Sequence, residues 1–413
     1  MIHATTDKEG MSMDLRALSH DERRVFEILQ KDGPRTKKYL EERLGWTPST
    51  TNRVIQSLLQ KTAIQETGFK ESTGGRRPSV FDIRADACCL LGLDFAHGYV
   101  RMALCDLKLR LLEEETLLVP PARDDPEVVL EAVSRTFDGF LARRGIPREA
   151  VLGAGLGMFG PVDRETGVTG LLMDYDQPIG AWSGIPIRDM LRERLGVPVC
   201  ADASCNCGAL AEYACAPERN DRDTAYFICD IGFTVGQVCS GRILRRPDGR
   251  YDGFAHVSID MNGKLCHCGK RGCVHLYASV RAIVQRIRQQ ALAGTPVSIP
   301  GPIEQANFGH VIEAAAREDP TATAALAEAG NCFGEALSTY LNLLRPDDLV
   351  LDGTLAETET FCRSVQETLA RYHGEELSRR IRFRRMGSYG RMTVAVGAAA
   401  LYYETLMKNP VLS

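Results

Sequence analysis

With 413 residues, the chain is too long for one compact core, so we expect two or three domains. Its 44% hydrophobic and 25% charged residues are typical of a soluble globular protein. No apolar run approaches the ~20 residues that cross a bilayer, so we expect no membrane segment. The net charge of −4 gives no sign of nucleic-acid binding by the chain as a whole.

The N-terminal 14 residues are polar and lack the apolar segment of a signal peptide. We therefore expect 1–14 to be a disordered tail and the protein to be cytoplasmic. The 14 cysteines of a chain without a secretion signal are expected to be reduced, with metal binding where their spacing is tight.

Three helices are expected over 20–61. The first spans 20–31 and the second 36–44, and a glycine after each one ends it. Thr47 and Pro48 supply the N-cap and the first residue of the third helix.

Two short strands are expected next, at 63–67 and 79–83, on either side of a polar, glycine-rich segment. A helix, a helix-turn-helix and a two-stranded hairpin make a winged helix-turn-helix. We therefore assign 15–85 to a DNA-binding domain.

The charge distribution favours the same assignment. Between residues 33 and 84 the chain has ten Lys and Arg against five Asp and Glu. This segment is therefore +5, which leaves −9 for the rest of the chain. A basic module on an acidic body is typical of a DNA-reading domain joined to a ligand-sensing domain.

The third helix has outward side chains of the types that reach phosphates and base edges. In its first two turns, where a recognition helix enters the major groove, these are Ser49, Thr50, Thr51, Asn52, Arg53 and Gln56. Arg76 and Arg77, at the tip of the wing, suit the DNA backbone or a narrow minor groove. We expect double-stranded operator DNA as the partner, pseudo-palindromic if the protein is a twofold dimer.

The pattern after residue 85 alternates strands and helices. Strands are expected at 88–95, 99–105, 107–118, 151–156, 197–201, 224–229, 236–238 and 349–351. Helices are expected at 127–144, 187–195, 277–292, 308–317, 320–343, 358–373 and 396–407. This order predicts an α/β fold with mixed sheets.

Three cysteines lie within eight residues, at Cys266, Cys268 and Cys273, and two glycines let the backbone fold around a metal. A fourth ligand would complete a tetrahedral Zn²⁺ site, and a closed site of this kind is structural. His256 is the preferred fourth ligand, with His275 and His267 as alternatives.

Five further segments are informative when they are taken together. They are 74–78, 91–94, Gly155 to Asp163 (GLGMFGPVD), His256 through Cys273, and 341–346 followed by Gly353. Together they resemble the ROK family (repressors, open reading frames and sugar kinases), and the zinc motif with a winged helix resembles its repressor branch. The resemblance implies a two-lobed actin/sugar-kinase-like (ribonuclease H-like) domain and a homodimer or homotetramer. The first lobe would span 86–205 and the second 206–413, with the C-terminal helix returning to the first lobe.

This sequence differs from the kinases of the family at the positions that the resemblance assigns to catalysis. At 94–98 the phosphate loop has lost both glycines and its threonine, and 232–237 departs from the usual pattern. Ser204 holds the position of the catalytic aspartate, and serine cannot act as the general base. A register shifted by two residues would instead place Asp202 there. On the ungapped alignment, we expect no kinase activity.

The resemblance also suggests where a small-molecule effector binds. The residues expected to line that cleft are Asp202, Ser204, Asn206, Asp252, His256 and His275. Carboxylates that would accept sugar hydroxyls are replaced, so the effector need not be a neutral sugar. We expect a sugar, a sugar acid or a sugar phosphate, and the two histidines favour the acidic or phosphorylated ligands.

The preferred hypothesis is a transcriptional repressor of carbohydrate-related genes, controlled by that effector. An active ATP-dependent sugar kinase with a DNA-binding head and a regulator controlled by a protein partner remain alternatives. A weaker alternative is a redox sensor using Cys200, Cys205 and Cys207, whose simpler explanation is buried apolar cysteine.

Overall fold

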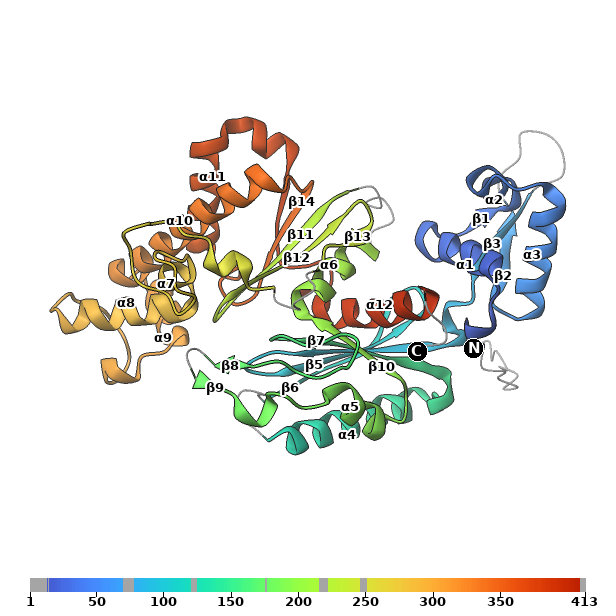
Figure 1. Cartoon of the computed structure of the whole chain (residues 1–413), viewed down its shortest axis with the longest axis horizontal. Coiled ribbons are helices and arrows are strands. Elements are labelled where there is room, and N and C mark those ends of the chain that lie inside the picture. Colours follow the sequence, from blue (N-terminus) through green and yellow to red (C-terminus); the bar gives the residue numbers. More distant parts are fainter. Residues whose placement is uncertain are drawn as a thin grey trace, which may run out of the picture.

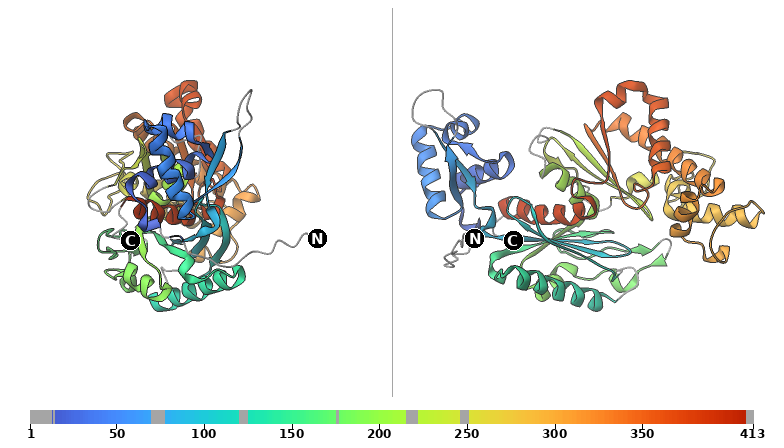
Figure 2. Two further views of the ribbon diagram at one scale, coloured as in Figure 1. Left: turned by 90° about the vertical axis from the view of Figure 1, so that its right-hand side faces the viewer. Right: turned by 180° about the vertical axis from the view of Figure 1, so that it is seen from behind.

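The computed structural model describes residues 13, 15–69, 78–119, 125–174, 177–214, 222–245 and 251–408. Figure 1 shows a small N-terminal head beside two lobes, each built on its own sheet. The two views of Figure 2 place the head at one end of the molecule, next to the C-terminal helix.

The head consists of three helices and a three-stranded sheet. The helices are α1 (His20–Asp32), α2 (Lys37–Leu44) and α3 (Pro48–Gln60). The strand order is β1 (Arg35–Thr36), β3 (Ser79–Ile83), β2 (Ile64–Phe69), all antiparallel. Thr47 caps α3 through the backbone N–H of Thr50, with Pro48 at the first position, as the sequence predicts.

The disordered tail expected at 1–14 is wrong at Met13. Met13 is 3% exposed and packs in the core, and its carbonyl accepts a hydrogen bond from the Cys88 thiol at 3.3 Å. Burial of the apolar Met13 side chain is favourable in free energy. Its polar neighbours in the sequence give no sign of this burial. Residues 1–12 and 14 lie outside the described residues.

The first lobe has a five-stranded mixed sheet with the order β10-β7-β4-β5-β6. Its strands are β4 (Cys89–Phe95), β5 (Val100–Asp106), β6 (Leu111–Leu117), β7 (Val151–Met158) and β10 (Val199–Ala203). Two helices, α4 (Pro126–Arg144) and α5 (Ile187–Leu195), cover one face of it (Figure 1). A two-stranded ribbon, β8 (Met173–Asp174) with β9 (Gln177–Pro178), lies outside the sheet.

The second lobe has a five-stranded sheet with the order β13-β12-β11-β14-β15. Its strands are β11 (Thr224–Cys229), β12 (Phe233–Cys239), β13 (Arg242–Ile243), β14 (Asp348–Asp352) and β15 (Arg382–Arg385). The helices of this lobe are α7 (His275–Ala278), α8 (Val280–Leu292), α9 (Phe308–Ala316), α10 (Pro320–Leu343) and α11 (Glu359–Arg380).

Short 3-10 helices join several of these elements. They are η1 (Leu15–Ala17), η2 (Ala85–Ala87), η3 (Arg148–Ala150), η4 (Gly180–Trp182), η6 (Gly253–His256), η7 (Ile303–Gln305) and η8 (Gly390–Met392).

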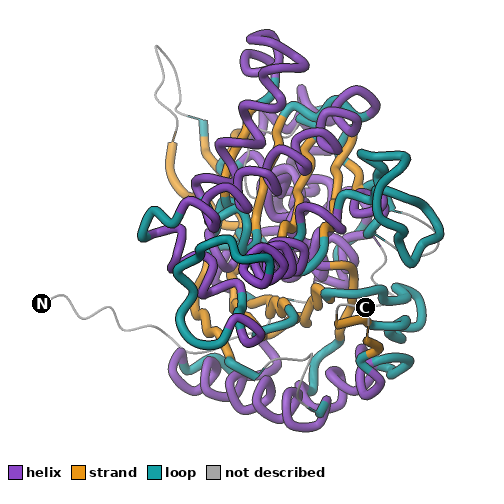
Figure 3. Tube along the Cα trace, turned by 90° about the vertical axis from the view of Figure 1, so that its left-hand side faces the viewer, coloured by secondary structure: helices purple, strands orange, loops and turns teal. Residues whose placement is uncertain are grey.

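Two helices form the layer between the sheets. They are α6 (Ser204–Ala214) and α12 (Thr393–Lys408), and α12 packs on β4 and β7 of the first lobe. Figure 3 shows helical segments between an upper and a lower group of strands. A Cβ added to Gly92 or Gly155 would lie 1.8 Å from a backbone oxygen of α12. The glycines of these strands therefore permit close packing of α12 on the sheet.

Most predicted elements differ from the observed ones by a few residues at their ends, and three of these differences have a clear local cause. The helix expected at 277–292 is broken at Ser279, whose extended backbone and side chain cap α8 through Ala282 N–H. The strand expected at 107–118 starts at Leu111, because Leu109 has a φ of 59° in a turn. The second head helix starts at Lys37, since Thr36 is its N-cap.

Candidate functional site

The exposed face of α3 carries most of the side chains expected to read DNA. Ser49, Asn52, Arg53 and Gln56 are exposed, and Thr50 is half-buried. The Asn52 side-chain oxygen accepts a hydrogen bond from Lys37 Nζ at 2.6 Å. Arg53 Nη2 lies 3.6 Å from Asp21 Oδ2, and both side chains are largely exposed. Ion pairs this exposed are weak, so Asp21 holds Arg53 only loosely.

Thr51 does not belong to this face, contrary to the sequence-based prediction. Its side chain is fully buried, and its hydroxyl donates to the Thr47 carbonyl at 3.2 Å. The physical reason is helical periodicity, which puts Thr51 on the same side as the buried Val54, Ile55 and Leu58. Arg76 and Arg77 lie outside the described residues.

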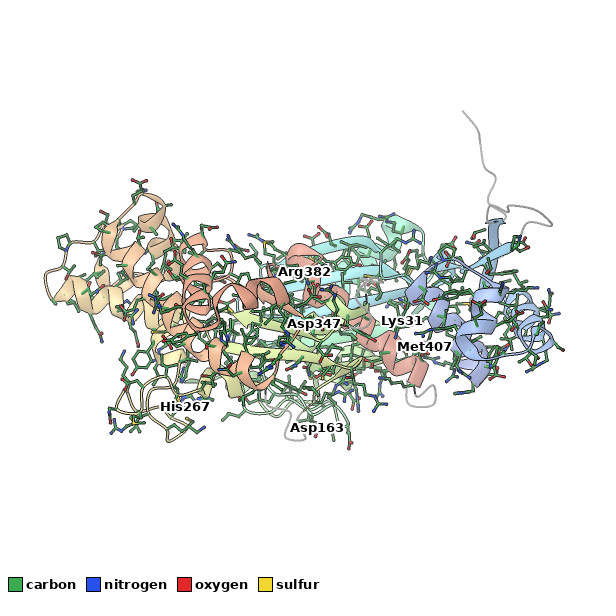
Figure 4. The ribbon with its side chains drawn as sticks, turned by 90° about the horizontal axis from the view of Figure 1, so that it is seen from above. Lys31, Asp163, His267, Asp347, Arg382 and Met407 are labelled. Atoms are coloured by element: carbon green, nitrogen blue, oxygen red, sulfur yellow. The ribbon has the colours of Figure 1, made fainter. Side chains whose placement is uncertain are left out.

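The head contacts the two central helices. Lys31 Nζ of α1 lies 5.4 Å from the ring centre of Tyr213, on α6. Arg23 Nη1 donates to the carbonyl of Met407, near the end of α12, at 3.5 Å. Figure 4 shows Lys31 and Met407 at the junction of the head with the lobes. An open groove of about 470 Å³ between α1 and the second lobe is lined by residues of both.

The Cys/His cluster forms in a loop of the second lobe between η6 and α7. Bridges between Ser258 and Cys273 and between Leu265 and Arg271 fold the loop back on itself. Gly272 makes this possible, because it has a φ of 71° and a Cβ there would lie 1.8 Å from the Asp260 carbonyl oxygen.

One set of ligand atoms fits a tetrahedral metal. The side-chain ligand atoms of His256, Cys266, Cys268 and Cys273 all lie within 4.8 Å of one another. Zn–S and Zn–N bonds of ~2.3 and ~2.0 Å at tetrahedral angles place ligand atoms about 3.5 to 3.8 Å apart. The Cys268 and Cys273 sulfurs are 3.6 Å apart, and Cys266 Sγ is 3.5 Å from His256 Nδ1. The donor set and its dimensions therefore fit Zn²⁺.

The electrostatics of the cluster agree with metal binding. Nε2 of His256 lies 3.6 Å from Asp252 Oδ2, the usual arrangement for a ligating imidazole. Burial raises the pKa of the Cys268 thiol, but the Lys270 backbone N–H and the two neighbouring thiols outweigh it and lower the pKa to about 7. Cys268 is therefore the thiol that loses its proton most readily to a metal, whereas burial raises the pKa of Cys266 and of Cys273.

Asp202 forms a second polar centre, at the end of β10. It is fully buried, and its Oδ1 accepts hydrogen bonds from the Asn206 amide and the Ala203 N–H, both at 2.8 Å. Its Oδ2 lies 2.9 Å from Nε of Arg245 and 3.1 Å from Nε of Arg164. Arg164 belongs to the first lobe and Arg245 to the second, so Asp202 links the two lobes through these ion pairs. The sequence gives no signal for either arginine, because their side chains meet Asp202 only in the fold.

Ser204 lies beside a buried carboxyl group of the first lobe. Its hydroxyl donates to Asp94 Oδ1 at 3.3 Å, and Arg101 lies 3.9 Å from Oδ2. Burial raises the pKa of Asp94 to about 7, against the opposing effects of Arg101 and Ser204. Ser204 therefore serves as a hydrogen-bond donor within the described structure.

The structure divides the six residues expected to line the effector cleft into two groups. Asp202, Ser204 and Asn206 lie together at the junction of β10 and α6. His256 and His275 instead face the thiol cluster, since His275 Nε2 is 3.1 Å from Cys266 Sγ. Asp252 pairs with His256. These two histidines therefore give no support for an anionic effector, because both rings face thiols.

The three cysteines of the redox alternative are poor nucleophiles. Burial raises the pKa of Cys200 and of Cys205 to about 12, and it raises that of Cys207 well above its usual value. Since the thiolate is the reactive form, these thiols are expected to be inert at neutral pH.

A two-lobed domain with a sugar-kinase-like arrangement of sheets, a winged head and a Cys/His loop defines the class of this protein. The ROK family profile matches residues 90–405, and the chain belongs to the ROK family. The xylose repressor of Bacillus spizizenii is 24% identical over 332 residues, which cover 80% of this chain and 81% of the relative. The DNA-binding transcriptional repressor Mlc of Escherichia coli K12 is 24% identical over 341 residues, covering 81% and 80%.

Solved structures support the same fold. A ROK family transcriptional regulator, a homologue of the E. coli Mlc protein, superimposes with a TM-score of 0.75 at 21% identity, covering 95% of this chain and 98% of that one. A ROK family glucokinase from Streptomyces griseus, in complex with glucose and AMPPNP, gives 0.62 at 24% identity, covering 76% and 98%. Among the described residues, no helix is both long and apolar enough to cross a membrane.

Proposed function

We propose that the chain is a transcriptional repressor of carbohydrate-related genes that binds a pseudo-palindromic operator through α3 and the wing. The observation that carries the proposal is the exposed polar face of α3, on a capped helix of a winged head joined to a ROK domain. The names of the relatives, which are sugar-related and DNA-binding repressors, point the same way. A homodimer or homotetramer would present two heads to the two half-sites.

The contacts of the head support a route by which the lobes control DNA binding. α6 begins two residues after Asp202, and its Tyr213 contacts Lys31 of the head. A ligand bound at Asp202, Ser204 and Asn206 would therefore act on the helix that supports α1. We propose that ligand-dependent closure of the lobes shifts the heads and changes their fit to the operator.

The effector in this proposal is a sugar, a sugar acid or a sugar phosphate. The guanidinium groups of Arg164 and Arg245 converge on Asp202, and Arg164 is 41% exposed. Guanidinium groups bind carboxylates and phosphates in two-point contacts, so these arginines favour the anionic ligands.

Zn²⁺ is proposed at His256, Cys266, Cys268 and Cys273, in a structural role, because a closed set of four protein ligands leaves no position for a substrate. The bound metal would supply rigidity to the loop, and the chain's own backbone bridges orient the ligands.

The contacts of Asp202 and Ser204 argue against kinase activity. Asp202 is held by two arginines and two further donors, so both of its oxygens are engaged and neither is free to accept a proton from a sugar hydroxyl. The hydroxyl of Ser204 is not basic enough to accept the proton of a sugar hydroxyl. We expect no ATP turnover when the protein is incubated with ATP, Mg²⁺ and the sugars and sugar acids of an effector panel.

Arg53 gives a direct test of the proposed DNA interface. Fragments of the source genome that bind the purified protein would be selected and sequenced, and the enriched site used in binding assays. Arg53→Ala should weaken binding about 10-fold, because a DNA-contacting arginine contributes ~1–3 kcal/mol. Arg135→Ala, on α4 of the first lobe, removes an equally exposed arginine and should leave binding unchanged. Equal affinities of the two variants would contradict the interface.

A further inference from the structure

The Cys/His loop contains more metal-ligand groups than one tetrahedral ion uses. Besides the four residues assigned to zinc, His267 and His275 face the same sulfur. His275 Nε2 lies 3.1 Å from Cys266 Sγ, and His267 Nδ1 lies 3.9 Å from it. The three ligand atoms all lie within 4.8 Å of one another. Figure 4 shows His267 in this part of the second lobe, away from the head.

The two histidines come from different segments, and the fold brings both of them to the Cys266 thiol. His267 stands between two cysteine ligands in the loop, whereas His275 is the first residue of α7. Their ring centres are 5.6 Å apart, and that of His275 is 5.2 Å from that of His256.

We infer that Cys266, His267 and His275 form a second, open metal site, which takes a divalent transition metal of the zinc type and shares the Cys266 thiolate with the structural zinc. A thiolate sulfur has several lone pairs and can bridge two ions. The observed S···N separations of 3.1 and 3.9 Å lie on either side of the ~3.5 Å expected for tetrahedral ligands. One thiolate and two imidazoles suit Zn²⁺ and its neighbours over Mg²⁺ or Ca²⁺.

The second site differs from the first because it leaves one coordination position of the ion open. Three protein ligands leave the fourth position of a tetrahedral ion to water or to an exogenous ligand. His267 is exposed and His275 is half-buried, so this ion meets solvent, whereas the buried Cys273 completes the ligand set of the first site. We therefore expect the second ion to exchange faster and to bind more weakly than the structural zinc.

Metal stoichiometry tests this inference, which rests on the zinc assignment of the proposed function. The full-length protein would be dialysed against buffered Zn²⁺, and bound metal measured by inductively coupled plasma mass spectrometry. We expect two ions per chain for the wild type and one for the double variant His267→Ala/His275→Ala. His310→Ala, on α9 outside the loop, serves as the control and should keep both ions.

The other outcomes separate the two assignments. One ion per chain in both the wild type and the double variant would overturn the second site and leave the structural zinc. Loss of the tightly bound ion from His275→Ala alone would place His275 in the first site and overturn the sharing of Cys266. Absence of bound metal from the wild type would overturn both assignments. Co²⁺ substitution adds a readout, since the second site should contribute a weaker thiolate-to-cobalt band that the double variant loses.

Discussion

Glu22 links the N-terminus of α1 to the end of α3. Its carboxylate accepts hydrogen bonds from Ser57 Oγ at 2.6 Å, from Lys61 Nζ at 2.7 Å and from the Ser19 backbone N–H at 2.6 Å. Burial alone would raise its pKa, but Lys61, Ser57 and Ser19 outweigh burial and lower the pKa from 4.5 to about 2. The charged form of Glu22 therefore stabilises the folded head.

The lowered pKa of Glu22 predicts the pH dependence of the head's stability. A group with a lowered folded-state pKa stabilises above its unfolded pKa and loses that contribution as pH falls through the folded value. Glu22 should thus contribute about 3 kcal/mol at neutral pH, lost between about pH 4.5 and pH 2. Urea unfolding of the wild type and Glu22→Gln should differ at about pH 7 and converge at about pH 2. A difference that persists at low pH would contradict this role, and Glu367→Gln, an exposed acid on α11, is the control.

Cys268 tests the zinc assignment. It is exposed, so Cys268→Ser removes a metal ligand without opening a cavity in the core. We expect loss of the structural ion and of effector-regulated DNA binding, measured by metal analysis and by binding assays on the same samples. Cys332→Ser, on α10, removes a thiol outside the cluster and should keep the metal. Full DNA affinity and ligand response in Cys268→Ser would show that zinc has no structural role in regulation.

At the residue scale, the sequence predicts chemical type better than orientation. The spacing of Cys266, Cys268 and Cys273 with His256 predicts a metal cluster, and the structure brings these ligand atoms together. Thr51 has the right chemistry for DNA but faces the core. Arg164 and Arg245 meet Asp202 from segments about 40 residues away on either side, and no local pattern indicates such a contact.

At the scale of elements, capped and amphipathic helices are the most predictable. The helices at 187–195 and 320–343 have the bounds expected from the sequence, and Asp319 with Pro320 starts the second of them. α6 is missed because it is buried on nearly every side and has no polar face to reveal a helical period. β15 is missed because its sequence, RFRR, has three charged side chains.

The packing of α12 on the first sheet predicts a large effect for one added methyl group. A Cβ at Gly155 would lie 1.8 Å from the Ala398 carbonyl oxygen, so the helix or the strand must move. Gly155→Ala should lower the free energy of unfolding by about 2 kcal/mol or more, measured by urea denaturation. Gly139→Ala, inside α4, meets only the end of the Arg143 side chain and should stabilise by up to ~1 kcal/mol. Equal effects of the two substitutions would contradict the close approach of α12.

At the scale of the whole molecule, the chain order and the spatial order differ. The last helix returns to the first lobe, between its sheet and α6, and reaches the head at Met407. Periodicity along the chain cannot reveal this return, which the resemblance to the ROK family alone predicts. The head, the central helices and the polar centre at Asp202 are therefore physically continuous, as an effector-controlled regulator requires.

Fluorescence anisotropy on the DNA upstream of the protein's own gene is the most direct test of effector-controlled operator binding. Titrations would include a salt series, random DNA as control, and a panel of sugars, sugar acids and sugar phosphates. We expect tighter binding to that DNA than to random DNA, weakening with salt as phosphate contacts require, and a change in affinity with one ligand class. Because two arginines converge on Asp202, we expect the anionic ligands to cause the larger change. Binding no tighter than to random DNA, unchanged by every ligand, together with ATP turnover on the same panel, would contradict it.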